Sequence, residues 1–140
     1  MPEEPGMRDL VELVRLANDA FNRRDVDAWL SFFSPDIVYR PVPTFTDSQE
    51  RQGLGAMRRF MEEWHDAWAD DYSTQVESIR EYGDVVIALL RLTGHAKTSG
   101  IEVAGGIFEV CRFRDGKIAS VEDFTDRAEA LKAVGPKRVG

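Results

Sequence analysis

The stretch FRDGKI at residues 113–118 decides the fold of this 140-residue chain. Asp-Gly between two apolar runs is typical of a tight hairpin, and we expect a type I turn with the glycine in the left-handed conformation. The runs 101–113 and 118–124 on either side are therefore predicted to be neighbouring antiparallel strands. Gly105-Gly106 predicts a bulge or a bend in the first of them.

Upstream of this hairpin, the hydrophobic pattern changes from a helical period to a strand period. Apolar residues at steps of three and four indicate helices, and Asp25 is the expected N-cap of the second one. A polar loop is expected over 44–52. We expect helices over 10–21, 26–33, 54–69 and 126–134, and further strands over 37–40, 74–80 and 85–93.

This order predicts an α+β fold with the helices on one face of a mainly antiparallel sheet. A strongly curved sheet around helices leaves a cone, and a small ligand would bind at its mouth. We expect one domain over 7–134, a disordered or extended N-terminus over 1–6 and a tail over 135–140.

The composition excludes several classes of function. Eighteen basic against 25 acidic residues give a net charge of −7, which argues against nucleic acid as a partner. The single cysteine, Cys111, excludes an intrachain disulfide and a multi-cysteine zinc site. No long apolar run or signal peptide is recognisable, so we expect a cytoplasmic protein that needs no membrane, metal or cofactor.

Three stretches resemble one known family. They are residues 21–28 (FNRRDVDA), residues 32–41 (FFSPDIVYRP) and the hairpin FRDGKI with its continuation through Asp123. Together they resemble the SnoaL-like branch of the nuclear transport factor 2-like superfamily, which implies a cystatin-like α+β barrel with a cone-shaped sheet. The superfamily includes ketosteroid isomerase, polyketide cyclases, limonene-1,2-epoxide hydrolase, dehydratases, transport adaptors and non-catalytic members, so the fold does not choose the function.

The resemblance implies Asp123 as the leading catalytic candidate, because an aspartate at this position handles a proton in the epoxide hydrolases and cyclases. In an apolar pocket its pKa would rise toward a range useful for acid–base chemistry. The alternative is a solvated acid at the end of a strand. If Asp123 faces inward, alternation places Val121 and Ala119 inward too, with Ala119 expected near Cys111.

Glu109 and Tyr39 complete the predicted catalytic set. Glu109 is expected beside Val121 and matches a position where ketosteroid isomerase carries a protonated aspartic acid. A bulge at the glycine pair would instead turn Glu109 outward, toward Arg112 or Arg114. Tyr39 matches a tyrosine that helps to hold water in the epoxide hydrolases; an ordinary strand aromatic is the alternative.

Departures from these families are equally informative. The epoxide hydrolase pattern needs an arginine and a second aspartate where this chain has Leu90 and Leu92, and an asparagine where it has Pro41. The tyrosine donor of ketosteroid isomerase corresponds to Ala17, and its general base falls near Pro41. Neither mechanism is therefore complete in this sequence.

Aromatic and apolar side chains are expected to line a ligand pocket, with plain core packing as the alternative. His65 is expected on a helix surface and His95 in a loop, without the carboxylate partners that a metal site needs. The predicted lining residues are Ala17, Phe21, Trp29, Met57, Met61, Trp64, Trp68, Leu90, Leu92, Ile107, Cys111 and Val121, and Phe60 lies on the same helix.

Two functions remain open on this basis. One is an isomerase, cyclase, dehydratase or hydrolase for a small polyketide-, terpenoid- or steroid-like compound. Asp123 would move a proton, Glu109 would be a neutral donor or second acid, and Tyr39 would orient the reacting oxygen. The other is a non-catalytic module that binds a hydrophobic ligand or dimerises. In either case the outer sheet face is expected to form a homodimer, as it often does in this family.

Overall fold

Six strands in one sheet and four helices make up the part of the chain that the computed structural model describes, residues 9–42 and 50–135. The expected N-terminus over 1–6, residues 44–49 of the expected polar loop and residues 136–140 of the expected tail lie outside these residues. The elements in chain order are α1 (Leu10–Asn22), α2 (Val26–Leu30), β1 (Phe33–Arg40), β2 (Arg51–Gln52), α3 (Leu54–Ala67), β3 (Ser73–Tyr82), β4 (Val85–His95), β5 (Glu102–Arg114), β6 (Lys117–Phe124) and α4 (Arg127–Val134).

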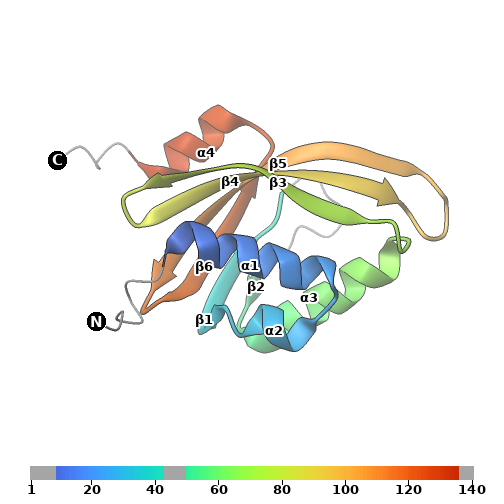
Figure 1. Cartoon of the computed structure of the whole chain (residues 1–140), viewed down its shortest axis with the longest axis horizontal. Coiled ribbons are helices and arrows are strands. Elements are labelled where there is room, and N and C mark those ends of the chain that lie inside the picture. Colours follow the sequence, from blue (N-terminus) through green and yellow to red (C-terminus); the bar gives the residue numbers. More distant parts are fainter. Residues whose placement is uncertain (1–8, 43–49, 136–140) are drawn as a thin grey trace.

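The sheet has the strand order β2-β1-β6-β5-β4-β3. Only β1 and β6 pair in parallel; the other four pairs are antiparallel. The sheet is curved and open, and Figure 1 shows α1, α2 and α3 together on one side of it. The predicted α+β class with a mixed, mainly antiparallel sheet is confirmed. The two-residue strand β2 was not predicted, because it lies at the end of the expected polar loop.

The helix boundaries follow from the caps that the sequence supplies. Asp9 accepts a hydrogen bond from the Val11 N–H at the start of α1. Asp25 accepts from the Ala28 N–H, so the predicted N-cap of α2 is confirmed. Such caps satisfy backbone donors that have no partner inside the helix. No helix in residues 9–42 or 50–135 has the length and apolar character needed to cross a membrane.

The expectation that all helices lie on one face is wrong for α4. This helix packs on the outer face of the sheet, where it buries Ala130 and Val134 against Val85, Ile87 and Val110 (Figure 1). The strands β4 and β5 carry apolar residues on both faces, so both faces need cover. The expected dimer contact through the outer face stays a prediction, and α4 occupies part of that face.

The central hairpin differs from the prediction in its turn and its register. Asp115 and Gly116 both have positive φ, 54° and 78°, and Arg114 pairs with Lys117, so the turn is a two-residue type I′ turn rather than type I. The bulge lies in β6, not at the predicted glycine pair: Phe113 pairs with Ile118 but Arg112 pairs with Ser120, which leaves one extra residue, Ala119.

The glycine pair itself continues the ladder without a shift. Gly105 pairs with Leu92 and Gly106 with Arg91 in an unbroken register between β4 and β5. The alternation of β5 therefore runs unchanged from the open end of the sheet to the hairpin. Glu109 stays on the inner face, and the outward orientation that a bulge would have produced is excluded.

Candidate active site

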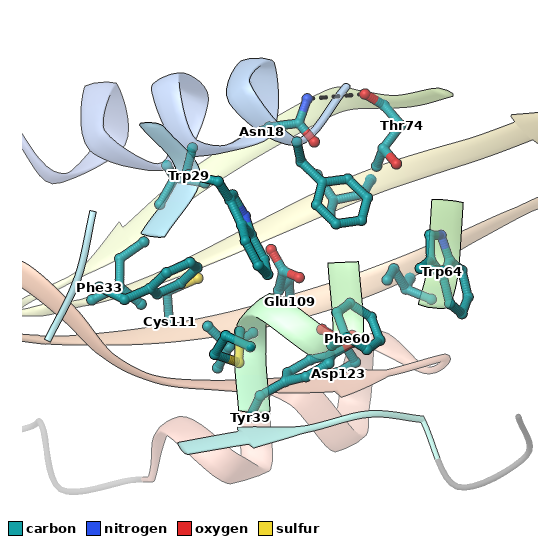
Figure 2. Close-up of a pocket in the computed structure, with 18 of the residues that line it drawn as sticks. Asn18, Trp29, Phe33, Tyr39, Phe60, Trp64, Thr74, Glu109, Cys111 and Asp123 are labelled. Carbon is teal, nitrogen blue, oxygen red and sulfur yellow. Dashed lines mark hydrogen bonds between the residues drawn. The ribbon is translucent and has the colours of Figure 1, made fainter. Parts of the chain in front are cut away.

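An inner cavity of about 90 Å³ lies between the helices and the concave face of the sheet. Its wall is mostly apolar and comes from α1, α2, α3 and strands on both sides of β5 (Figure 2). The lining residues are Val14, Ala17, Asn18, Phe21, Trp29, Phe33, Tyr39, Met57, Phe60, Trp64, Tyr72, Thr74, Leu90, Leu92, Ile107, Glu109, Cys111, Ile118, Val121 and Asp123.

Three acidic or phenolic side chains meet in this cavity. Glu109 on β5 and Asp123 on β6 are direct cross-strand partners, so their side chains leave the sheet on the same face. The Tyr39 hydroxyl on β1 donates a 2.7 Å hydrogen bond to Asp123 Oδ2. The second oxygen, Oδ1, is buried, and the Asp123 carboxyl group also shares a hydrogen bond with the carboxyl group of Glu109. Asp123 is only 2% exposed, whereas Glu109 keeps part of its surface toward the cavity.

Local sequence explains how this cluster forms. The extra residue Ala119 reverses the alternation of β6, so that Ile118 lines the cavity before the bulge and Val121 and Asp123 line it afterwards. The prediction that Ala119 faces inward beside Cys111 is therefore wrong; Cys111 pairs with Val121. Across β4, Glu109 faces Ala88, and this small side chain leaves room for the carboxyl group.

Burial perturbs both carboxyl groups. The pKa of Asp123 is raised well above its ordinary value, first by burial and then by the negative charge of Glu109, while the Tyr39 hydrogen bond opposes the rise. The pKa of Glu109 is also raised by burial. Because two carboxylates this close cannot both ionise easily, the pair titrates as a unit and retains one proton above the ordinary carboxyl range. Burial and the charge of Asp123 raise the pKa of Tyr39, which keeps its hydroxyl protonated.

A second polar group lies in the same cavity. Asn18 on α1 and Thr74 and Tyr72 beside it line the wall, and Figure 2 shows Asn18 and Thr74 at the opposite end from Tyr39 and Asp123. Sequence reasoning missed this group. A signal was present for Asn18, because it lies four residues after Val14, on the apolar face of α1.

Most of the predicted lining residues reach the inner cavity, but two do not. Met61 is 3% exposed and packs in the core without reaching the cavity wall. Trp68 follows the end of α3 in an extended conformation (φ −110°, ψ 150°), which carries it away from the helix face and into a neighbouring space. Whether the other lining residues contact a ligand stays a prediction.

That neighbouring space is an outer chamber of about 590 Å³. It adjoins the inner cavity, because Phe60, Trp64, Tyr72, Leu92 and Ile107 line both. The other described residues that line the outer chamber are Arg51, Glu63, Ala67, Trp68, Val103, Ala104, Gly105, Gly106 and Thr125.

The two histidines differ from the prediction. His65 is buried, 7% exposed, and its Nε2 lies 2.9 Å from the Phe21 carbonyl oxygen. A carbonyl only accepts, so Nε2 carries the hydrogen. The surface assignment was wrong because His65 follows Met61 by four residues and shares its inner face.

His95 ends β4 rather than lying in a loop, and it does have a carboxylate partner: its Nδ1 lies 2.6 Å from Asp71 Oδ2. This hydrogen bond raises the pKa of His95, whereas burial lowers the pKa of His65. Within the described ranges, no group of three histidine, cysteine or acidic side chains could hold a metal ion.

Residues 14–121 match the model of the SnoaL-like domain. The chain belongs to this family. The structure of this SnoaL-like domain resembles that of an NTF2-like protein from Burkholderia thailandensis. The two share 24% sequence identity and a TM-score of 0.77, over 93% of this chain and 100% of that one. It also resembles a proposed SnoaL-like polyketide cyclase from Jannaschia sp. CCS1, at 20% identity, a TM-score of 0.74 and coverage of 97% and 98%.

A third similar structure is that of TerC co-crystallised with polyporic acid, at 18% identity, a TM-score of 0.72 and coverage of 92% and 97%. At these identities the likeness of the SnoaL-like domain to its neighbours shows the fold alone. A search of curated proteins by sequence finds no match.

Proposed function

We propose that this protein is an enzyme that moves protons on a small, largely apolar molecule, as isomerases, cyclases, dehydratases and hydrolases of this fold do. The observation that carries the proposal is the buried pair Glu109–Asp123, paired across β5 and β6 inside an apolar cavity, with Tyr39 bonded to one of them. Membership in the SnoaL-like family and the likeness to a proposed polyketide cyclase support a small-molecule-binding or cyclase-like role.

The pair supplies an acid and a base side by side. In this scheme the one proton of the pair is on Asp123, which is only 2% exposed, and Glu109 is the carboxylate because it keeps part of its surface toward the cavity. Glu109 takes a proton from a carbon next to a carbonyl group while Asp123 gives its proton to the carbonyl oxygen, which leaves an enol and no net change in protons. Where a carbon–carbon double bond is conjugated with the enol, Glu109 gives its proton to the far carbon of that double bond while Asp123 takes back the enol proton, which yields an isomer. Attack of the enol on a second carbonyl group of the same molecule closes a ring.

Tyr39 acts on the acid rather than on the substrate in this scheme. Its hydroxyl hydrogen points at Asp123 Oδ2, so it orients that carboxyl group and stabilises its ionised form after the proton has left. The expectation that Tyr39 orients the reacting oxygen of a ligand is replaced here by this positioning role.

Two connected spaces suggest the shape of the substrate. The inner cavity is smaller than the roughly 150 Å³ engineered cavity that holds benzene, so it takes the reacting portion of a molecule. The outer chamber falls within the range of about 300–1,000 Å³ that is usual for ligand sites, and it would take the rest. Its aromatic wall, with Trp64 and Trp68, favours a flat ring system.

The alternative function is a non-catalytic module that binds an apolar ligand. One observation favours it: among the described residues that line the inner cavity, none is a lysine, arginine or histidine that could stabilise a developing negative charge. The two functions share the binding site and differ only in proton transfer, so an exchange experiment separates them.

The test is solvent deuterium exchange into the cyclic ketones 1-indanone and 1-tetralone, read by mass spectrometry. We expect exchange at the carbon next to the carbonyl above the uncatalysed rate, and a loss of about 10²-fold or more in Asp123→Asn and Glu109→Gln. The matched control is Glu122→Gln. Glu122 directly precedes Asp123 in β6, and its register partner is Val110 of the outer core, so it lies on the opposite face of the sheet.

Binding is followed in parallel by the fluorescence of Trp29 and Trp64, which line the inner cavity. Quenching by the ketones without exchange above the Asp123→Asn level would favour the non-catalytic alternative. Absence of both quenching and exchange would contradict the ligand site itself.

A further inference from the structure

We propose that Asn18, Tyr72 and Thr74 form a second polar subsite, which holds a hydroxyl group of the ligand inside the inner cavity. The buried portion of the ligand then carries two neutral oxygen functions, one beside the acid pair and one at this subsite, and the rest of the molecule lies in the outer chamber. This inference rests on the proposed ligand site and adds a requirement that the acid pair alone does not impose.

The subsite has an acceptor whose orientation is fixed. Asn18 Nδ2 donates to the Thr74 carbonyl oxygen at 2.9 Å. Since a carbonyl can only accept, the amide nitrogen must face it, and the amide oxygen is held on the other side. Asn18 Oδ1 receives no hydrogen bond from a described residue, and Asn18 lines the cavity (Figure 2).

Asn22 shows that Asn18 is not required to hold the strand. Asn22 Nδ2 donates to the same Thr74 carbonyl at 2.8 Å, and Asn22 Oδ1 accepts from the Thr74 N–H at 2.9 Å. Asn22 thus satisfies both backbone groups of Thr74 from the next turn of α1, but it does not line the cavity. The two asparagines share one partner and differ in access to the ligand.

The subsite also has a donor. The Thr74 and Tyr72 hydroxyls, both in residues only 5% exposed, share one hydrogen bond of 3.3 Å. A further hydrogen bond joins the Trp64 side chain to the Tyr72 hydroxyl, and because an indole N–H only donates, this bond uses neither hydroxyl hydrogen. Of the two hydroxyl hydrogens, one joins Thr74 to Tyr72 and the other remains for a ligand. A ligand hydroxyl both donates and accepts, so it matches an amide oxygen next to a hydroxyl hydrogen.

The electrostatics of the cavity favour neutral ligand ends. The described lining residues with ionisable acids are Glu109 and Asp123, and no cationic side chain compensates them. A carboxylate or phosphate at either end would be buried without a counter-charge, at a high desolvation cost. Hydroxyl and carbonyl groups avoid this cost.

The experiment uses pairs of probes that differ by a methyl and a hydroxyl group at the far end. The pairs are 2-butanone with hydroxyacetone and 2-pentanone with 4-hydroxy-2-butanone, which cover two lengths and are small enough for the inner cavity. Kd values are measured by ¹⁵N NMR titration of the wild-type protein, Asn18→Leu and Asn22→Leu. Thr74→Val, which removes only the hydroxyl group, is a second test from another element.

The readout is the ratio of the Kd of the hydroxyl probe to that of the methyl probe, because the ratio cancels general losses of affinity. We expect this ratio to rise about 3- to 10-fold in Asn18→Leu and in Thr74→Val in at least one pair, as loss of a neutral hydrogen bond implies. It should not change in Asn22→Leu. An unchanged ratio in both subsite variants, or an equal rise in Asn22→Leu, would overturn the subsite while leaving the proposed function intact. Absence of binding by all four probes would contradict both.

Discussion

Tyr39 and Asp123 lie 84 positions apart in the sequence, and the tyrosine hydroxyl donates a 2.7 Å hydrogen bond to the aspartate Oδ2. The bond joins β1 to β6, which form the one parallel pair among the described strands. It places a protonated phenol against a buried carboxyl group and thereby moderates the rise in the pKa of Asp123.

The first prediction follows from this bond. Tyr39→Phe should raise the pKa of Asp123 further, because the hydrogen bond favours the ionised form. It should also lower the free energy of unfolding by about 1–3 kcal/mol, since a buried acceptor loses its partner. Carbon-13 NMR titration of the Asp123 carboxyl group and urea denaturation measure the two effects. Tyr82→Phe, on the outer core, is the control and should change neither; an unaltered Asp123 titration in Tyr39→Phe would contradict the prediction.

The pH dependence of stability provides the second prediction. A carboxyl group whose pKa is raised in the folded state stabilises the fold fully below its unfolded pKa of about 4, and this contribution is lost as the pH rises through the folded pKa. Asp123→Asn mimics the protonated acid and escapes this loss. Relative to the wild-type protein, the variant should therefore gain stability from about pH 4 upward, as measured by urea unfolding at several pH values.

The comparison between the two proteins removes the effects of titrating groups that do not interact with Asp123, and the remaining difference belongs to the Glu109–Asp123 pair. Asp36 and Asp71, for example, have lowered pKa values because of hydrogen bonds from Ser34 and His95, and they contribute equally to both proteins. Parallel stability curves for the wild-type protein and Asp123→Asn would show that Asp123 is not perturbed.

The two histidines should titrate on opposite sides of their ordinary pKa of 6.5. His95 should titrate above it because of the Asp71 hydrogen bond, and His65 below it because of burial. Asp71→Asn should return His95 toward its ordinary value and leave His65 unchanged. Two-dimensional ¹H–¹³C NMR of the imidazole rings measures both at once, and a single shared pKa for the two rings would rule out this assignment.

Gly94 allows β4 to pass close to Tyr72. Its φ is +147°, and a Cβ atom at this position would lie 2.6 Å from the Tyr72 Cα. Gly94→Ala should therefore lower the free energy of unfolding by about 1–3 kcal/mol or more, because backbone must move. Gly105→Ala is the control: a Cβ there meets nothing within 4 Å. Equal stability of the two variants in thermal or urea unfolding would contradict the close approach.

Sequence reasoning predicted the fold well because the fold depends on short-range patterns. The helical period of α1, the N-cap at Asp25 and the Asp-Gly turn are all local signals, and each led to the right element. Alternation along β5 and β6 gave an inward orientation of Glu109 and Asp123 as one of two alternatives, and the observed registers of the two strands decide for it. The family resemblance added the order of the elements.

The features that sequence reasoning missed depend on the geometry of single residues or on partners that are distant in the sequence. One extra residue in β6 shifted the register and exchanged Ala119 for Ile118 in the cavity wall. The polar end of the cavity needs α1 and β3, which are more than 50 residues apart and come together only through tertiary packing. The position of Trp68 depends on where α3 ends, and helix ends are the least predictable feature of a pattern.

The extra residue in β6 also sets the identity of the internal acid. Strand parity is binary, so a β6 with the same residues but strict alternation from Ile118, without the bulge at Ala119, would exchange the interior and exterior halves of the strand beyond it. Glu122 would then enter the cavity, one methylene longer than the acid it displaces, and Asp123 would turn toward water. The identity of the acid inside the cavity therefore depends on the β6 bulge as well as on the residue types of the strand.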